Sequence, residues 1–148
     1  MAAAPERIVI TGAGGYLGGR VVEHLTGAGH RVAALSRRPA PWLQVPVAPI
    51  DLVDDPDEIE GTFEGAAAVI HLAGANEARV VDDPERALTS TIVAARHVAH
   101  SCVAMGVKRV VYVSTMHVYG AALAPGASVT EATMPEPCSD YAIARLTA

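Results

Sequence analysis

Tyr141 and Arg145 stand four residues apart near the end of the chain. Residues at this spacing share one face of a helix, so a helix here would make the phenol and the guanidinium neighbours. A positive charge beside a phenol favours its ionised form, which suits a phenol that exchanges a proton with a reacting oxygen. The pair therefore indicates acid–base chemistry, although two unrelated surface side chains would give the same spacing.

A glycine-rich segment, Thr11–Gly18, directly follows the apolar run Ile8–Ile10, and within it Gly12, Gly15 and Gly18 are spaced three apart. A strand that turns sharply into a helix needs backbone conformations that glycine adopts without strain. The free N–H groups and the positive dipole end of that helix attract a pyrophosphate. The spacing predicts a dinucleotide site, although a strand-turn-helix that binds no ligand can show the same pattern.

The next expected strand is followed by Ser36, Arg37 and Arg38. An acidic residue at this place would accept hydrogen bonds from the adenosine ribose of NAD. Guanidinium groups instead bind phosphate in a planar fork, which suits the ribose 2′-phosphate of NADP. The sequence therefore favours NADP(H) over NAD(H), while a solvated basic loop would leave the choice open.

Two more expected strand ends would meet the same ligand. Asp51 and Leu52 close the third strand, where they could face the adenine, although a carboxylate that caps the next helix is an equal alternative. After the fourth strand, Leu72, Ala73 and Gly74 are small or apolar enough to let a cofactor pass close to the backbone. We expect all of these residues at the carboxyl edge of one sheet.

Hydroxyl groups follow the fifth expected strand, at Ser114 and Thr115, and would face the same edge. Two histidines lie close to these strand ends. His71 is expected to be a packed side chain rather than a base. His117 could serve as a base, but a packing role is at least as consistent with its position.

Strand and helix patterns alternate along the whole chain. The expected strands are residues 8–11, 31–35, 47–51, 67–72 and 109–114, and the expected helices cover residues 16–28, 56–61, 84–105 and the segment from 139 onward. Alternation of this kind implies parallel pairing and right-handed crossovers. The fold class is therefore α/β, a doubly wound parallel sheet of Rossmann type whose ligand lies at the carboxyl ends of the strands.

Composition narrows the class of protein. The chain has 148 residues, of which 51% are hydrophobic, so one domain with a full core is expected. The net charge of −5 argues against a general nucleic-acid binder, and no apolar run approaches membrane-spanning length. Residues 1–5 are too short and uncharged for a signal peptide. Cys102 and Cys138 show no metal or redox spacing, so we expect free thiols in the cytoplasm and no metal site.

In six segments the chain resembles the extended short-chain dehydrogenases/reductases, in the NAD-dependent epimerase/dehydratase group. The matching segments are residues 11–18, 51–52, 71–74, 106–109, 113–120 and 141–145. The resemblance implies an NAD(P)(H)-dependent oxidoreductase or epimerase that acts on a hydroxyl or carbonyl carbon. A sugar nucleotide is the first expectation for the substrate, and a small metabolite ketone is the second. By this resemblance Tyr141 is the general acid/base, Thr115 bonds the reacting substrate oxygen, and Tyr16 and Leu17 join the glycines at the pyrophosphate.

The chain departs from the family's pattern at three places. The family has Lys where this chain has Arg145, and a guanidinium keeps the charge but does not deprotonate or reproduce a compact ammonium. It usually has Asn at the position of Thr91. Sugar-nucleotide 4,6-dehydratases carry an acidic pair where this chain has Met116 and His117. The alternative function is therefore a nucleotide-binding pseudoenzyme or non-redox scaffold, and a third hypothesis is a structural domain that binds no nucleotide.

Ala148 ends the sequence three residues after Arg145, whereas the family's chains continue into further strands and a smaller substrate-binding region. We therefore expect residues 1–148 to be the NAD(P)-binding domain, with the substrate-binding region outside this chain, or else a partner chain that completes the fold. The fifth strand would then be an apolar edge, which invites association. The long helix over residues 84–105 could pair subunits in a homodimer.

Overall fold

A computed structural model describes residues 6–148, and it divides into two compact units. The first unit holds the chain up to Ala73 together with Ala94–Val113. The second unit holds Gly74–Val93 and Ser114–Ala148.

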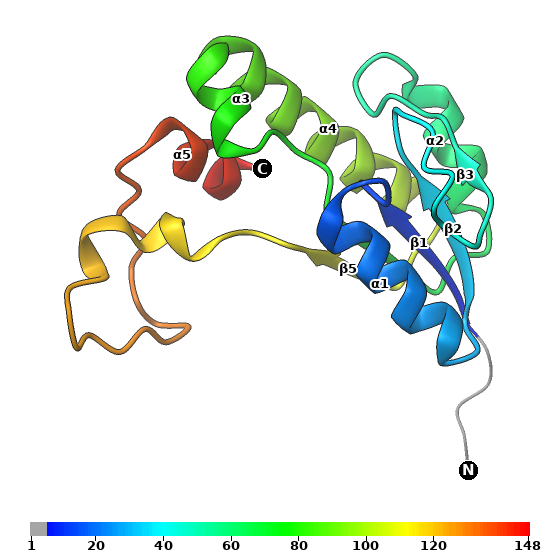
Figure 1. Ribbon diagram of the computed structural model, residues 1–148, viewed down its shortest axis with the longest axis horizontal. Coiled ribbons are helices and arrows are strands. Elements are labelled where there is room, and N and C mark those ends of the chain that lie inside the picture. Colours follow the sequence, from blue (N-terminus) through cyan, green and yellow to red (C-terminus); the bar gives the residue numbers. More distant parts are fainter. Residues whose placement is uncertain (1–5) are drawn as a thin grey trace. The chain divides into compact units, whose positions relative to one another are not determined.

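The first unit is built on one sheet of parallel strands, ordered β3-β2-β1-β4-β5 (Figure 1). The strands are β1 (Arg7–Thr11), β2 (Arg31–Leu35), β3 (Val47–Ala48), β4 (Ala68–His71) and β5 (Arg109–Tyr112). The α/β fold class and the parallel pairing predicted from the sequence are confirmed. The third strand is shorter than expected, because β3 pairs with β2 only at its two residues and the chain then turns away.

Helices connect these strands, and most of them were predicted from periodicity. They are α1 (Tyr16–Gly27), α2 (Pro56–Phe63), α3 (Glu77–Asp82), α4 (Pro84–Ala104), the 3-10 helix η1 (Met116–Ala122) and α5 (Asp140–Thr147). The sequence analysis missed α3 and η1, which are short. Each begins with a local side-chain cap, since Asn76 accepts a hydrogen bond from the Arg79 amide and Thr115 accepts one from the His117 amide.

At β1 both faces of the sheet are buried, and successive residues of this strand point to opposite sides. Val9 lies in a core cluster with side chains of α2 and of the second half of α4. Ile8 and Ile10 lie in the other cluster, which includes Val22 of α1. This arrangement explains why β1 reads as a continuous apolar run.

β5 forms one edge of the sheet in the first unit. β5 pairs with β4 alone among the described strands, and its Val110 and Val111 remain 47% and 43% exposed. The expectation of an apolar edge strand is therefore met in this part of the chain.

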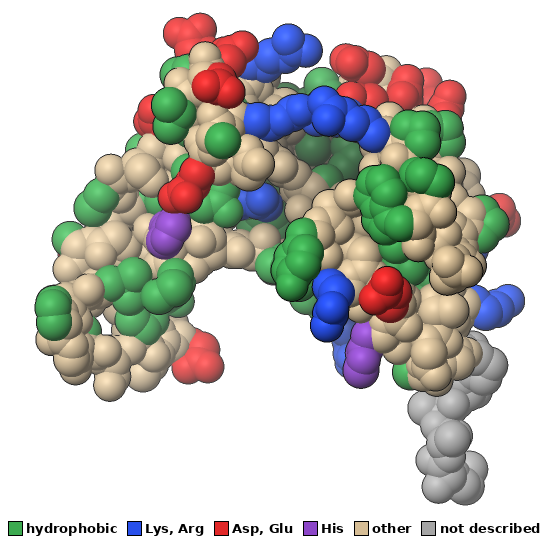
Figure 2. Space-filling view, in the orientation of Figure 1, with side chains coloured by type: hydrophobic (Ala, Val, Ile, Leu, Met, Phe, Trp, Pro, Cys, Tyr) green, Lys and Arg blue, Asp and Glu red, His purple; other side chains and the backbone are tan. Residues whose placement is uncertain are grey.

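Acidic side chains gather over the region of α2 (Figure 2), in keeping with Asp57 and Glu58 in its first turn.

The second unit contains α3, η1, α5 and the first half of α4. α5 contacts both α3 and η1. Its start at Ser139 is as predicted, since the Ser139 hydroxyl accepts a hydrogen bond from the Ala142 amide. Gly120, inside η1, has φ +40°, and a Cβ there would overlap the Glu136 carbonyl oxygen, so the return of the chain from residue 136 depends on this glycine. No helix in residues 6–148 combines the length and apolar character that crossing a bilayer requires.

Candidate functional site

The glycine turn joins β1 to α1 as the spacing predicted. Gly12 has φ +72°, and a Cβ at this position would come within 2.6 Å of the Ala73 amide nitrogen. A Cβ at Gly18 would overlap the Gly12 carbonyl oxygen. Neither position can take a larger residue without movement of the backbone.

The first two residues of α1 are exposed, whereas Gly18 and Gly19 are buried. Gly15 is its N-cap and offers no side-chain hydrogen bond to the helix amides. Tyr16 and Leu17 follow it and are 87% and 49% exposed. The helix therefore begins with backbone N–H groups that no side chain caps, next to a turn without side-chain bulk, which is the arrangement that an anionic group requires.

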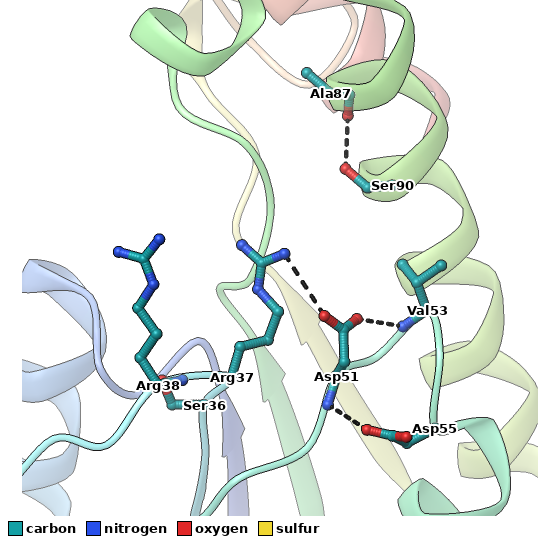
Figure 3. A network of polar contacts seen from close by, with 8 residues as sticks. All are labelled: Ser36, Arg37, Arg38, Asp51, Val53, Asp55, Ala87 and Ser90. Atoms are coloured by element: carbon teal, nitrogen blue, oxygen red, sulfur yellow. Dashed lines mark hydrogen bonds and ion pairs between the residues drawn. The ribbon is translucent and has the colours of Figure 1, made fainter. Parts of the chain in front are cut away.

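The basic segment after β2 holds its two arginines differently. Arg37 Nη1 lies 3.6 Å from Asp51 Oδ2, whereas Arg38 makes no ion pair with any residue in 6–148. Figure 3 shows the two guanidinium groups extending from adjacent positions, and only that of Arg37 turns toward the carboxylate. Ser36 lies against the glycine turn, since a Cβ on Gly14 would come within 2.5 Å of its Oγ.

Asp51 organises the loop after β3 and does not cap α2. Its Oδ1 accepts a hydrogen bond from the Val53 amide at 2.9 Å, and its own amide donates to Asp55 Oδ2 at 2.9 Å (Figure 3). The N-cap of α2 is Asp55. Leu52 is 6% exposed and belongs to the core, and its carbonyl oxygen accepts a hydrogen bond from the His97 ring at 2.8 Å.

The end of β4 lies next to the glycine turn. The Leu72 amide donates to the Thr11 carbonyl oxygen at 3.2 Å, which continues the pairing of β4 with β1. Ala73 follows, and its amide nitrogen is the atom that a Cβ on Gly12 would meet. His71 is 2% exposed and its Nδ1 lies 2.6 Å from Thr11 Oγ1, so the packed histidine predicted from the sequence is confirmed.

In the second unit, Tyr141 is flanked by two basic side chains. Arg145 Cζ lies 5.6 Å from the centroid of the Tyr141 ring, so the shared helix face predicted from the spacing is confirmed. The His117 ring lies 5.9 Å from the same centroid, in an edge-on arrangement at 76°. His117 Nδ1 is also 3.2 Å from Glu77 Oε1. Glu77 was not predicted, because it lies on a short helix that is packed against α5.

Thr115 and Tyr141 are linked through His117. The Thr115 hydroxyl accepts a hydrogen bond from the His117 amide at 3.3 Å, and the ring of that histidine meets Tyr141. The hydroxyl of the neighbouring Ser114 donates to the Arg145 carbonyl oxygen at 3.2 Å. The segment after β5 is therefore bound to α5 at two places.

The predicted site residues thus fall into two groups. Those expected to bind the nucleotide lie in the first unit, except Gly74. Gly74 belongs to the second unit with Thr115, Tyr141 and Arg145, and the Arg145 guanidinium lies directly against it. Within residues 6–148, no group of three or more His, Cys, Asp or Glu side chains is arranged to hold a metal ion.

Comparisons with known proteins give one consistent result. The model of the NAD dependent epimerase/dehydratase family matches residues 8–148. The solved structure of MoeE5 in complex with UDP-glucose and NAD is 27% identical, with a TM-score of 0.84 over 95% of this chain and 46% of that chain.

Two curated proteins are similar at the level of sequence. A 2-alkyl-3-oxoalkanoate reductase of Shewanella oneidensis is 27% identical over 78% of this chain and 30% of its own length. Cinnamoyl-CoA reductase 1 of Oryza sativa subsp. japonica is 28% identical over 96% of this chain and 43% of its own length. The chain therefore spans less than half the length of these relatives.

Proposed function

The chain belongs to the NAD dependent epimerase/dehydratase family, and from this we propose that it binds NADP(H) in preference to NAD(H). We assign to it a part in redox or epimerisation chemistry at a hydroxyl or carbonyl carbon. The substrate class is a sugar nucleotide or a small carbonyl metabolite. Support comes from similarity to MoeE5, solved with UDP-glucose and NAD, and to two reductases.

The observation that carries the proposal is the cradle at the glycine turn. A Cβ at Gly12 or Gly18 would overlap backbone atoms of Ala73 or Gly12, so the turn can pass this close to its neighbours only with glycine, and α1 begins there with amides that no side chain caps. A dinucleotide pyrophosphate fits this arrangement, because it needs close approach to the backbone and hydrogen-bond donors directed at it. Gly15, Tyr16 and Leu17 complete the lining. Leu72, Ala73 and Gly74 are proposed to lie along the part of the dinucleotide beyond the pyrophosphate.

The preference for NADP(H) rests on Arg38. Its guanidinium pairs with no acidic side chain among residues 6–148, and its amide donates a hydrogen bond to Ser36 Oγ at 3.4 Å. A ribose 2′-phosphate would find here a planar set of donors, whereas the NAD ribose would find no carboxylate reserved for it. Arg37 is held by Asp51, which we propose to face the adenine side of the site with Leu52.

The proposed acid/base is Tyr141. Its phenol exchanges the proton of the reacting substrate oxygen, and the Thr115 hydroxyl donates a hydrogen bond to the same oxygen. The Arg145 guanidinium lies beside the ring, with Cζ 5.6 Å from its centroid. A bound nicotinamide would supply the acceptor or donor of hydride.

The test is a titration of the protein with NADPH and with NADH, followed by nicotinamide fluorescence. We expect saturable binding of both and tighter binding of NADPH. No binding of either nucleotide would overturn the proposal, and tighter binding of NADH would overturn the cofactor preference. Turnover on a panel of sugar nucleotides and ketones should be lost in Tyr141→Phe and kept in Tyr119→Phe, which removes a phenol outside the proposed site.

A nucleotide-binding scaffold without turnover is the second candidate function. The observation that favours it is Arg145, which replaces the Lys of the family and is buried against Gly74 rather than extended. Binding of NADPH without turnover of any substrate in the panel would select this alternative.

The compartment and the assembly state also belong to the proposal. Both cysteines are free, which supports a reducing compartment such as the cytoplasm. The exposed valines of β5 support association with a second copy or with another chain.

A further inference from the structure

Ala75 is bound from both sides by two of the residues at which the chain departs from its family's pattern, Thr91 and Arg145. Its amide donates a hydrogen bond to Thr91 Oγ1 at 3.1 Å, and its carbonyl oxygen accepts one from Arg145 Nη2 at 3.5 Å. We infer that Arg145 is a positioning residue, coupled to Thr91 through Ala75, that fixes the Tyr141 helix against the segment Gly74–Ala75. This goes beyond the proposed function and relies on it only for the role of Tyr141.

The burial of Arg145 supports this role. Arg145 is 9% exposed. An ideal Cβ on Gly74 would lie 2.8 Å from Nη1, 2.9 Å from Cζ and 3.0 Å from Nη2 of its guanidinium. Because these three distances are nearly equal, the flat face of the guanidinium lies over Gly74. A planar group can cover Gly74 and bind Ala75 at once, whereas the single ammonium of a lysine could not do both.

Thr91 completes the arrangement from α4. It is 1% exposed, and its hydroxyl oxygen accepts the Ala75 amide hydrogen. The bond is partly buried, so its loss would remove a stabilising contact of the Ala75 amide, and the bond thereby helps to hold Ala75 in place. The position of the Ala75 carbonyl, and with it that of the guanidinium, follows from Thr91.

Arg145 connects the fixed position of Ala75 to Tyr141, the proposed acid/base. Its guanidinium stands 5.6 Å from the Tyr141 ring, and its carbonyl oxygen accepts a hydrogen bond from Ser114, the residue before Thr115. Arg145 therefore binds the segment at residues 74–75, the segment at 114–115 and its own helix. In this arrangement, replacement by the family's lysine loosens the unit instead of restoring an optimum.

The test is a double-mutant cycle with Arg145→Lys and Thr91→Val in the whole protein. Hydrogen exchange of the Ala75 amide and the melting temperature are measured, together with the ¹⁹F resonance of 3-fluorotyrosine placed at position 141. Thr91→Val should speed exchange at Ala75 by about tenfold, as loss of one partly buried hydrogen bond implies. It should also shift the Tyr141 resonance, although no hydrogen bond, ion pair or ring contact in the described residues joins Thr91 to Tyr141.

Arg145→Lys should shift the same resonance, lower the melting temperature and not increase turnover. The effects of Arg145→Lys and Thr91→Val should be non-additive. Thr91→Ser should leave exchange of the Ala75 amide at the rate of the parent protein, because it keeps the hydroxyl. Arg96→Lys, an exposed arginine on the same helix as Thr91, is the matched control and should change none of these quantities.

Additive effects, or an unchanged Tyr141 resonance in Thr91→Val, would overturn the inference. A lysine variant with higher turnover and unchanged melting temperature would do the same. The exchange, resonance and melting measurements do not require turnover, so a protein that fails to act on any substrate would refute the proposed enzyme function and still test the coupling.

Discussion

Thr11 and His71 face each other on neighbouring strands, with Thr11 Oγ1 2.6 Å from His71 Nδ1. Both side chains are buried, at 0% and 2% exposed, in the middle of the sheet. The ring of Tyr112 on β5 lies 5.5 Å from the His71 ring, so a row of polar side chains crosses three strands. Thr11 is also the last residue before Gly12, so this row of polar side chains lies directly next to the start of the glycine turn.

Replacement of Thr11 by valine keeps the shape and removes the hydroxyl. We expect Thr11→Val to lower the free energy of unfolding by about 1–3 kcal/mol, because it leaves a buried ring nitrogen without this partner. Urea denaturation measures the change. Thr89→Val, at an exposed helix position, should stay within about 0.5 kcal/mol of the parent. An unchanged stability in Thr11→Val would show that the bond contributes nothing.

The two arginines after β2 should differ in their effect on cofactor binding. Arg38→Ala should weaken NADPH binding by about 10- to 100-fold, the loss of a charge-assisted contact with phosphate, and leave NADH binding nearly unchanged. Arg37→Ala should have a smaller effect, because Asp51 already pairs with Arg37. Fluorescence titration of both nucleotides measures these affinities.

Asp51→Asn is the complementary change. It releases Arg37 from its carboxylate partner and should strengthen NADPH binding in relation to NADH. Equal losses of NADPH affinity in Arg37→Ala and Arg38→Ala would contradict the division of roles between the two arginines.

Gly18 and Gly27 lie on the same helix and provide a matched pair. A Cβ at Gly18 would overlap the Gly12 carbonyl oxygen, while a Cβ at Gly27 would meet nothing within 4 Å. Gly18→Ala should therefore abolish NADPH binding and lower the melting temperature. Gly27→Ala should keep binding and raise the free energy of unfolding by about 0.4–1 kcal/mol, because alanine restricts the unfolded chain. Calorimetry and NADPH titration test both, and unaltered binding in Gly18→Ala would argue against the cradle.

The two cysteines should react very differently. Burial raises the pKa of the Cys102 thiol from 9.0 to about 11, whereas Cys138 is exposed. A thiol-specific reagent near pH 8 should label Cys138 alone in the folded protein and both thiols in denaturant. Mass spectrometry identifies the labelled residue, and rapid labelling of Cys102 in the folded state would contradict its burial.

The same shift has a consequence for stability. The folded protein holds the Cys102 proton more tightly than the unfolded chain, so the contribution of this thiol is fully present below pH 9.0 and is lost as the pH rises toward about 11. Cys102→Ala should remove this part of the alkaline decline. Denaturant titrations of both proteins across this pH range measure the difference, and parallel declines would show that other groups cause it.

Much of the fold could be predicted because it depends on local sequence. The alternation of apolar runs and helical periodicity identified the strands and the longer helices, and the Ser139 cap identified the start of α5. α3 and η1 were missed because helices this short carry no readable periodicity and are held by their contacts with α5. The capping role considered for Asp51 was wrong, because Asp55 lies closer to the helix start and takes that position.

By itself, the sequence determined the glycine turn, the parallel α/β architecture and the pairing of Tyr141 with Arg145, since backbone freedom and residue spacing act within a few residues. Tertiary structure alone decided what each charge binds. Arg37, although its side chain is half exposed, pairs with Asp51, and Arg145 meets the carbonyl of Ala75, a residue 70 positions earlier. Contacts between distant segments depend on how the whole chain packs, and no local pattern encodes them.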